Sequence, residues 1–299
     1  GLCNLDIFGN PVECFPSATL RFRDASRVVV DSCTFDFCNF PVFFEGDCNE
    51  NIVTNCRITD GTGYWSHAAF KRTIDVVAGL FDPAFGTYGR YLENAGIHFR
   101  PAAGQTVRGN VVWKNTVTGV VTGIGLGFPN GSVMADSDIS ENRISWCYDA
   151  IDALGEHRNT RIWGNEAGHC PVGISLISRE QKPVYVFRNV LHHLDQRQNY
   201  QTDPNFLACD NTETHQSWST ALKLNAGDDT GEPTDLICFI HNTVHSTEPL
   251  AFNLYLWQPT WKVLQLRNNL FYAEGNANFF FDGVGNQPLY SLESVGDNV

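Results

Sequence analysis

The sequence has few charged residues, almost no methionine and no long apolar run. Charged residues make up 18% of its 299 residues, and there is a single Met. Runs rich in Leu, Glu and Lys are scarce, which argues against a helical protein. Short segments rich in Val, Ile and Phe, separated by Asn, Asp and Gly, predict strands and turns instead. No apolar run is long enough to cross a membrane, so we expect no membrane insertion.

The formal net charge of −13 argues against nucleic acid as a partner, because nucleic-acid binding relies on basic patches. It also disfavours a polyanionic substrate, although a local basic groove could override the global sign. There is neither an initiator Met nor a signal-peptide pattern, so we expect a mature or excised form. A chain of this length can bury a sizeable core.

One pattern recurs along the chain: an apolar residue, two variable residues, Asn, one variable residue and a second apolar residue. The shortest interval between copies is 23 residues, and longer intervals predict insertions. A repeat of this length without a helical segment predicts a coil of parallel strands whose turns, or rungs, stack at ~4.8 Å. An inward Asn could hydrogen-bond to its equivalents one rung away. The anchors, two with Cys in the Asn place, are Cys33, Cys56, Asn110, Asn142, Asn165, Asn189, Asn242 and Asn269.

The repeat is carried by "TRIWGNEAGHCPVGISL", "PVYVFRNVLHHL", "ICFIHNTVHSTEPLAFNLYL" and "VLQLRNNLFYA". With these segments the chain resembles the right-handed parallel β-helix superfamily, whose coil is shared by pectate lyases, polygalacturonase-type glycosidases, tailspikes and adhesins. The resemblance implies an all-β, single-stranded right-handed parallel β-helix of about eight or more rungs. It says little about function, because this coil hosts lyases, hydrolases, epimerases and inert fibres. We expect a cap or upstream rung at 1–26, the β-helix at 27–283 with insertions near 60–93, 127–137 and 195–219, and a tail or cap at 284–299.

Cys38, Cys147 and Cys170 each lie five residues after an anchor, so they share a second inward column. The simplest interpretation is a stack of core thiols. A disulfide between neighbouring rungs is the alternative, because the rung spacing is close to the Cα separation that a disulfide requires. The chain has no C-x-x-C spacing, so we expect no structural zinc site.

Residues at equal distances from the anchors form columns along the coil. Asp152 lies ten residues after Asn142, between apolar neighbours, so its side chain should point outward. His98 and Lys223 then sit two rungs away on either side, on the order of 10 Å, which leaves room for a sugar ring. The column contains Phe43, His98, Gly125, Asp152, Ser175, Lys223 and Asn253, and two residues further on lie Glu45, Arg100 and Asn225.

Asp149 lies three residues before Asp152, at the expected turn into the strand. Two carboxylates at one cleft suit glycoside hydrolysis, in which one is the acid and the other the base or nucleophile. The stretch "YDAIDALGEHRNTRI" looks like the acid pair and N-x-R-I rung of some β-helix proteins from bacterial carbohydrate-degrading systems. It departs from them at Ala150 and Ala153, where Gly or a further acid is expected.

Basic groups near this face suit a different reaction. Elimination from a uronate needs a base for the C5 proton and a positive group, often with Ca²⁺, to neutralise the carboxylate. Lys223 as the base, assisted by Arg100 or His98, would make the chain a polysaccharide lyase. A third interpretation is structural: Asp149 caps a turn, and Asp152 pairs with Arg100 or Lys223. If Ca²⁺ is a cofactor, its ligands would be Asp149, Asp152 and Glu156, although no dense acidic loop is present.

The insertions near 60–93 and 195–219 would emerge beside the face that carries Asp152. They could form the walls of a groove there. Their aromatic residues suit stacking on sugars, although aromatics in long loops also serve to pack the loop. The residues are Tyr64, Trp65, Tyr88, Tyr200 and Trp218. The histidines at 192, 193, 241 and 245 flank the anchors, where a polar residue is expected to be satisfied locally.

We therefore expect a secreted or cell-surface enzyme that degrades a polysaccharide or oligosaccharide in a groove on the coil, with hydrolysis slightly preferred over elimination. The alternatives are a non-catalytic segment of a fibre, adhesin or filament, and a carbohydrate-binding module. An uncapped coil would also expose strand edges that invite end-to-end self-association.

Overall fold

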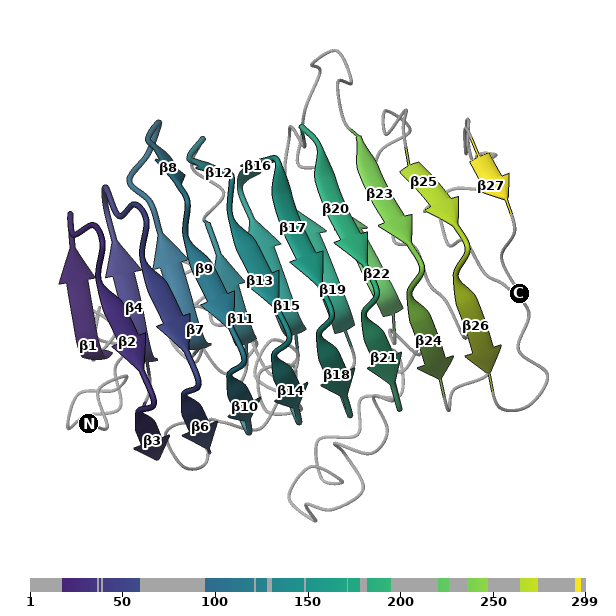
Figure 1. Ribbon diagram of the computed structural model, residues 1–299, viewed down its shortest axis with the longest axis horizontal. Helices are drawn as coiled ribbons and strands as arrows, with labels where there is room; N and C mark the ends of the chain where they lie inside the picture. The colour runs from purple at the N-terminus through teal and green to yellow at the C-terminus, as the bar shows by residue number, and fades with distance from the viewer. Residues whose placement is uncertain are drawn as a thin grey trace, which may run out of the picture.

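The computed structural model describes residues 18–36, 38, 40–59, 95–120, 122–127, 131–147, 149–170, 172–177, 182–194, 220–225, 236–246, 264–273 and 294–296. Within these ranges the regular secondary structure is entirely β-strand, and every strand pair is parallel. The strands form four sheets that run along the axis of one coil (Figure 1).

The sheets differ in length, and each is named here by its number of strands. The seven-stranded sheet contains β1 (Ala18–Arg23), β4 (Phe40–Glu45), β7 (Ala95–Arg100), β11 (Thr122–Leu126), β15 (Asp149–Leu154), β19 (Val172–Ile177) and β22 (Thr220–Asn225). The nine-stranded sheet contains β2 (Val29–Asp31), β5 (Ile52–Thr54), β9 (Val111–Trp113), β13 (Asp138–Ser140), β17 (Thr160–Trp163), β20 (Val184–Phe187), β23 (Ile237–Ile240), β25 (Leu264–Arg267) and β27 (Ser294–Gly296).

The other two sheets complete the coil. The eight-stranded sheet contains β3 (Thr34–Asp36), β6 (Arg57–Thr59), β10 (Thr116–Thr118), β14 (Arg143–Ser145), β18 (Glu166–Gly168), β21 (Val190–His192), β24 (Thr243–Ser246) and β26 (Leu270–Ala273). The three-stranded sheet contains β8 (Thr106–Arg108), β12 (Val133–Ala135) and β16 (Glu156–Arg158). Thus the segment 127–137, expected as an insertion, contributes β12 to a regular sheet.

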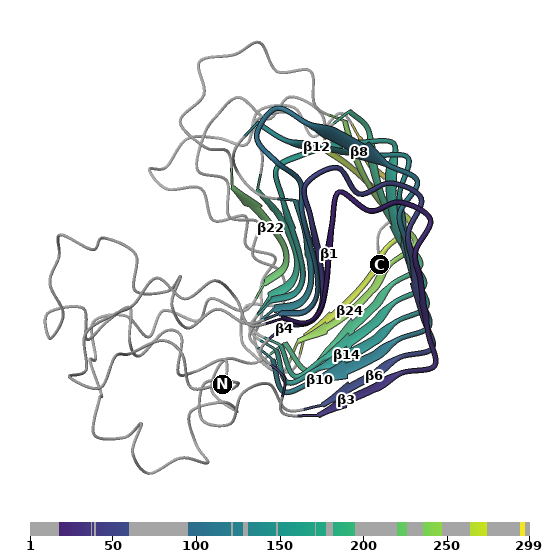
Figure 2. The same cartoon turned by 90° about the vertical axis from the view of Figure 1, so that its left-hand side faces the viewer.

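Each rung follows one path around the coil, as the end-on view in Figure 2 shows. From β15 the chain passes through β16, β17 and β18, and then returns to β19, the neighbour of β15 in the seven-stranded sheet. The expected all-β coil of parallel strands is therefore confirmed.

A ladder of buried asparagines connects the rungs. The side-chain amide of each Asn donates to the Oδ1 of the next, as from Asn142 to Asn165 at 2.9 Å and from Asn165 to Asn189 at 3.0 Å. Each amide also donates to a backbone carbonyl of an earlier rung, as from Asn165 to Ile139 at 2.9 Å. These bonds satisfy polar groups that would otherwise be costly to bury. The ladder consists of Asn115, Asn142, Asn165, Asn189, Asn242 and Asn269.

The assignment of Asn110 to this ladder was wrong, and Asn115 takes that place. Asn110 lies at another corner, where its Oδ1 accepts from the side-chain amide of Asn51 at 3.0 Å. Its backbone N–H donates to Ser137 Oγ at 3.2 Å. Because apolar residues stand at 107, 112 and 117, both asparagines fit the sequence pattern. Counting from Asn115 also places Gly125 ten residues after its anchor, as for Asp152.

The interior of the coil is filled by apolar columns. Ile124, Ile151 and Ile174 are paired across neighbouring strands and are fully buried in one continuous core. Cys147 and Cys170 belong to the same core as free thiols, so the interpretation as core thiols is confirmed and the disulfide alternative is wrong. Burial raises the pKa of the Cys147 thiol well above its ordinary value, and the neighbouring Cys170 acts in the same direction.

Candidate functional site

The predicted column exists on the seven-stranded sheet. His98 pairs with Gly125, Gly125 with Asp152, Asp152 with Ser175, and Ser175 with Lys223. Phe43 pairs with His98 at the other end and belongs to a small apolar cluster with Phe40 and Ala95, separate from the interior core. The column therefore points out of the coil, and the predicted register is confirmed from Phe43 to Lys223.

Pointing out of the coil does not make these side chains solvent-exposed. Asp152 is only 9% exposed and Ser175 is fully buried, whereas His98 and Lys223 are half-buried. Phe43 and Gly125 are also buried, so the expectation of an exposed surface column was wrong for every position from Phe43 to Lys223 except the half-buried His98 and Lys223. Strand alternation specifies which side of a sheet a residue occupies, but not what packs on that side.

Asp149 and Asp152 lie on the same outer side of β15 although they are three residues apart. Ala150 and Ile151, between them, both belong to the interior core, so the strand presents two consecutive residues inward. Asp149 pairs with Thr122, which in turn pairs with Ala95 of the outer cluster. Asp149 is thus a strand residue rather than a turn cap, and it is only 3% exposed.

Two buried polar atoms on this side have no hydrogen-bond partner within the described residues: Asp149 Oδ1 and Ser175 Oγ. Leaving such an atom without a partner typically costs about 1–3 kcal/mol. Native structures keep few of these atoms, and those that remain often mark functional positions. These two oxygens therefore mark the outer side of the seven-stranded sheet as a candidate functional site.

His98 occupies the space above Gly125, on the side of Asp152. Its ring stacks on Phe43, with 5.4 Å between centroids and 14° between planes, and Phe40 meets it edge-on at 5.9 Å. A Cβ atom added to Gly125 would lie 2.3 Å from His98 Nδ1, so this ring position requires the glycine. The small residue expected to form a floor for a sugar instead accommodates the imidazole.

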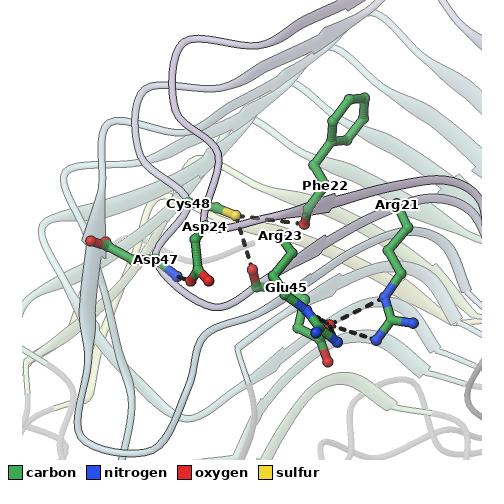
Figure 3. Close-up of polar contacts among 7 residues, drawn as sticks. All are labelled: Arg21, Phe22, Arg23, Asp24, Glu45, Asp47 and Cys48. Atoms are coloured by element: carbon green, nitrogen blue, oxygen red, sulfur yellow. Dashed lines mark hydrogen bonds and ion pairs between the residues drawn. The ribbon is translucent and has the colours of Figure 1, made fainter.

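The neighbouring column contains an ion-paired carboxylate. Figure 3 shows Glu45 between Arg21 and Arg23, with Oε2 accepting from the two guanidinium groups at 2.6 and 2.9 Å. Partial burial alone would raise the pKa of Glu45, but hydrogen bonds and charges from both arginines lower it overall. Arg100 pairs with Glu45 in register on β7, two strands before Asp152. Glu45 therefore has a structural role in this region.

The chain matches the family model described as a right handed beta helix region over residues 3–189. It belongs to the right-handed β-helix family. The match confirms the resemblance and the handedness of the coil. Comparisons with curated proteins and with solved structures found no match.

Several of the predicted substrate-binding residues lie outside the described part of the β-helix: Tyr64, Trp65, Tyr88, Tyr200, Trp218 and Asn253. Asn225 is the last residue of β22, where its backbone pairs with Ile177. Its side chain is outside the described set. The roles of these residues remain predictions.

The suggested calcium ligands do not come together. Glu156 lies on β16 in the three-stranded sheet and forms an ion pair with Arg158 at 2.5 Å, whereas the two aspartates are on β15. Across the described ranges no group of three or more His, Cys, Asp or Glu side chains is arranged to hold a metal ion. The described residues also contain no α-helix that is long and apolar enough to cross a membrane.

Two groups of side chains elsewhere on the β-helix were not predicted as groups, although the sequence placed His192 and His193 beside the anchors. In a histidine cluster, the rings of His169 and His193 stack at 4.8 Å, and Nδ1 of His193 lies 2.7 Å from Nδ1 of His192. The nine-stranded sheet carries an outer row of aromatic residues, each two positions before a ladder asparagine. The constant offset of two positions before the ladder asparagine is the signal in the sequence that identifies this row.

Proposed function

We propose that this β-helix degrades a polysaccharide along the outer side of its seven-stranded sheet, as a glycoside hydrolase. The observation that carries the proposal is the pair of buried carboxyl groups, Asp149 and Asp152, on one side of β15. Glycoside hydrolysis needs one carboxyl group as the general acid and another as the base or nucleophile. The proposal takes the substrate to be an extracellular polysaccharide and therefore includes secretion or a cell-surface location.

The spacing of the two aspartates favours one stereochemical outcome. Three residues of a fully extended strand separate Cα atoms by on the order of 10 Å, and the two consecutive inward residues, Ala150 and Ile151, shorten this path. Inverting glycosidases hold their carboxyl groups roughly 6.5–9.5 Å apart to admit a water molecule, whereas retaining enzymes hold them at about 5–5.5 Å. The wider class fits this arrangement better. We therefore expect inversion at the anomeric carbon.

The remaining residues of the column would position the substrate. Ser175 pairs with Asp152 and is fully buried, so it would support the position of Asp152 rather than contact the sugar itself. His98 and Lys223 stand two rungs away on either side, on the order of 10 Å from Asp152 along the axis, where they can contact neighbouring sugars.

Lys223 supports a second candidate, a polysaccharide lyase. Its side chain is half-buried in the same column as Asp152, with Ser175 between them. An amine in this position could remove the C5 proton of a uronate while a positive group neutralises the carboxylate. Elimination creates a double bond that absorbs ultraviolet light, so the two reactions are directly distinguishable.

The test is activity on a panel of neutral and acidic polysaccharides, with reducing ends and ultraviolet absorbance recorded together. The variants are Asp149→Asn, Asp152→Asn and Lys223→Met. Asp36→Asn is the matched control, because Asp36 is an exposed aspartate on the eight-stranded sheet. Circular dichroism verifies that each variant is folded.

The hydrolase proposal predicts new reducing ends without absorbance, lost in both site variants and retained in Asp36→Asn. Absorbance that rises with the reducing ends and disappears in Lys223→Met would replace hydrolysis with elimination. Activity that survives both aspartate substitutions, or folded wild-type protein that cleaves nothing in the panel, would overturn the proposal.

A further inference from the structure

The outer side of the nine-stranded sheet carries an aromatic row that the candidate site does not use. Trp113 pairs with Ser140, Ser140 with Trp163, and Trp163 with Phe187, on four successive strands. The three aromatic side chains are half-buried, so each keeps some exposed surface. They line an open groove of about 640 Å³ together with Val111, Asp138, Ser140, Glu141, Arg161 and Arg188.

The groove has an ordered aromatic floor. The rings of Trp163 and Phe187 are nearly parallel, with 8° between planes and 6.0 Å between centroids. The indole N–H of Trp163 donates to Asp138 Oδ1 at 3.2 Å, which directs the ring toward the preceding rung. Ser140 on that rung is only 3% exposed and adds no bulk between the two tryptophans. Trp113 and Trp163 are thus two rungs apart, on the order of 10 Å, about the length of two linked sugar rings.

The charges along the groove nearly balance, with the ammonium of Lys114, 4.2 Å from the centroid of the Trp113 ring, as one additional positive charge. Two acidic residues, Asp138 and Glu141, and two basic residues, Arg161 and Arg188, line it, in a chain whose net charge is −13. Asp138 forms an ion pair with Arg161, and Glu141 lies 3.7 Å from the ammonium of Lys114. Such a surface offers donors and acceptors without a dominant sign, so it complements a neutral polyhydroxylated ligand better than a polyanion.

We propose that this groove binds a neutral polysaccharide, whose sugar rings stack on Trp113 and Trp163 along the coil axis. The stack on Phe187 and the hydrogen bond to Asp138 hold the Trp163 ring in place before binding, which lowers the entropy cost of association. Planar aromatic side chains supply contact area, and the polar residues on either side supply hydrogen bonds to hydroxyl groups. The site is separate from Asp149 and Asp152 and does not depend on their role.

The test is native gel electrophoresis of the whole chain in gels containing a soluble polysaccharide. The probes are barley β-glucan, xyloglucan, galactomannan and, as the acidic comparison, polygalacturonate. The variants are Trp113→Ala and Trp163→Ala, and either one can carry the test if the other fails to fold. The matched control is Trp146→Ala, because Trp146 is an exposed tryptophan beyond the eight-stranded sheet, stacked on His169.

We expect at least one neutral polysaccharide to retard the wild type, and high salt to leave the retardation unchanged. Each groove variant should weaken binding at least about tenfold, as truncating a buried aromatic contact commonly does, while Trp146→Ala should bind normally. Equal retardation of the wild type and folded groove variants would overturn the proposal. Failure of every neutral probe, or binding only to polygalacturonate, would do the same. Asp36→Asn, outside both sites, should bind like the wild type, and retardation is measured without any cleavage step, so this test is independent of hydrolysis.

Discussion

His157 should make the folded chain sensitive to mild acid. It lies at the centre of β16, where it pairs with Met134 of the adjacent strand and is fully buried. Neither ring nitrogen has a hydrogen bond of standard length within the described residues. Burial lowers the pKa of His157 to about 4, against a smaller opposing effect of the backbone of Leu154 and Leu126. The folded state therefore holds this imidazole neutral.

The magnitude follows from proton linkage. Because the folded pKa lies below the unfolded value near 6.5, the unfolded chain binds the proton more tightly. The stability contributed by neutral His157 is thus fully present above about pH 6.5 and is lost as the pH falls toward 4. Each tenfold difference in proton affinity corresponds to about 1.4 kcal/mol. The free energy of unfolding should therefore fall by roughly 3 kcal/mol in all as the pH decreases through both pKa values. Between pH 7 and 4.5 the loss should be roughly 2–3 kcal/mol.

The assay is urea unfolding at several pH values for the wild type and His157→Leu. Leucine is similar in size and leaves no buried polar atom without a partner, so the variant should be at least as stable at pH 7. Its loss of stability toward pH 4.5 should be smaller than that of the wild type by the amount above. His241→Asn, which removes an exposed histidine, should keep the wild-type dependence. Parallel pH profiles for wild type and His157→Leu would refute the reasoning.

Three further predictions concern the coil itself. Asn142→Ala breaks the ladder and leaves buried partners without hydrogen bonds, so urea unfolding should show a loss of at least about 2 kcal/mol. Gly127→Ala should prevent folding, as judged by circular dichroism, because its Cβ would lie 1.9 Å from the carbonyl oxygen of Leu154. Gly104→Ala, at a similar positive φ but with nothing within 4 Å, should fold and lose only about 1–2 kcal/mol. Cys147 should resist thiol reagents at pH 8 until urea is added, since burial raises its pKa; rapid labelling of folded protein would contradict this.

The asparagine ladder explains why so much of the fold could be predicted from the sequence. Each ladder residue fixes the register of its rung, so positions counted from Asn142 and Asn165 placed Asp152 and Ser175 correctly side by side. The exception was Asn110, because the sequence pattern fits two corners of the same rung and only the hydrogen bonds to Asn51 and Ser137 separate them.

The candidate site was less predictable than the fold. Counting positions from the ladder asparagines predicts which side of the sheet a side chain occupies, but not what packs against it. The repeat placed Asp152 on the outer side, but its 9% exposure depends on packing that no periodicity encodes. The position of Asp149 depended on two consecutive inward residues, Ala150 and Ile151, which strict alternation does not allow. The sequence showed that Gly125 has no side chain in this column. It did not show that the imidazole of His98 occupies the space that a side chain at 125 would need.

The two proposed sites also constrain each other. Asp152 faces outward from the seven-stranded sheet and Trp163 from the nine-stranded sheet, and each rung crosses both sheets in turn. A single sugar ring cannot contact both residues, because they lie on the outer sides of different sheets of the same coil. If both proposals are correct, we expect binding at the tryptophans to hold the coil on a long or insoluble polysaccharide and so to raise the effective concentration of other segments at the aspartates, rather than to orient the bond being cleaved. The asparagine ladder keeps both sides in fixed register, so the chemistry of each can vary without changing the fold.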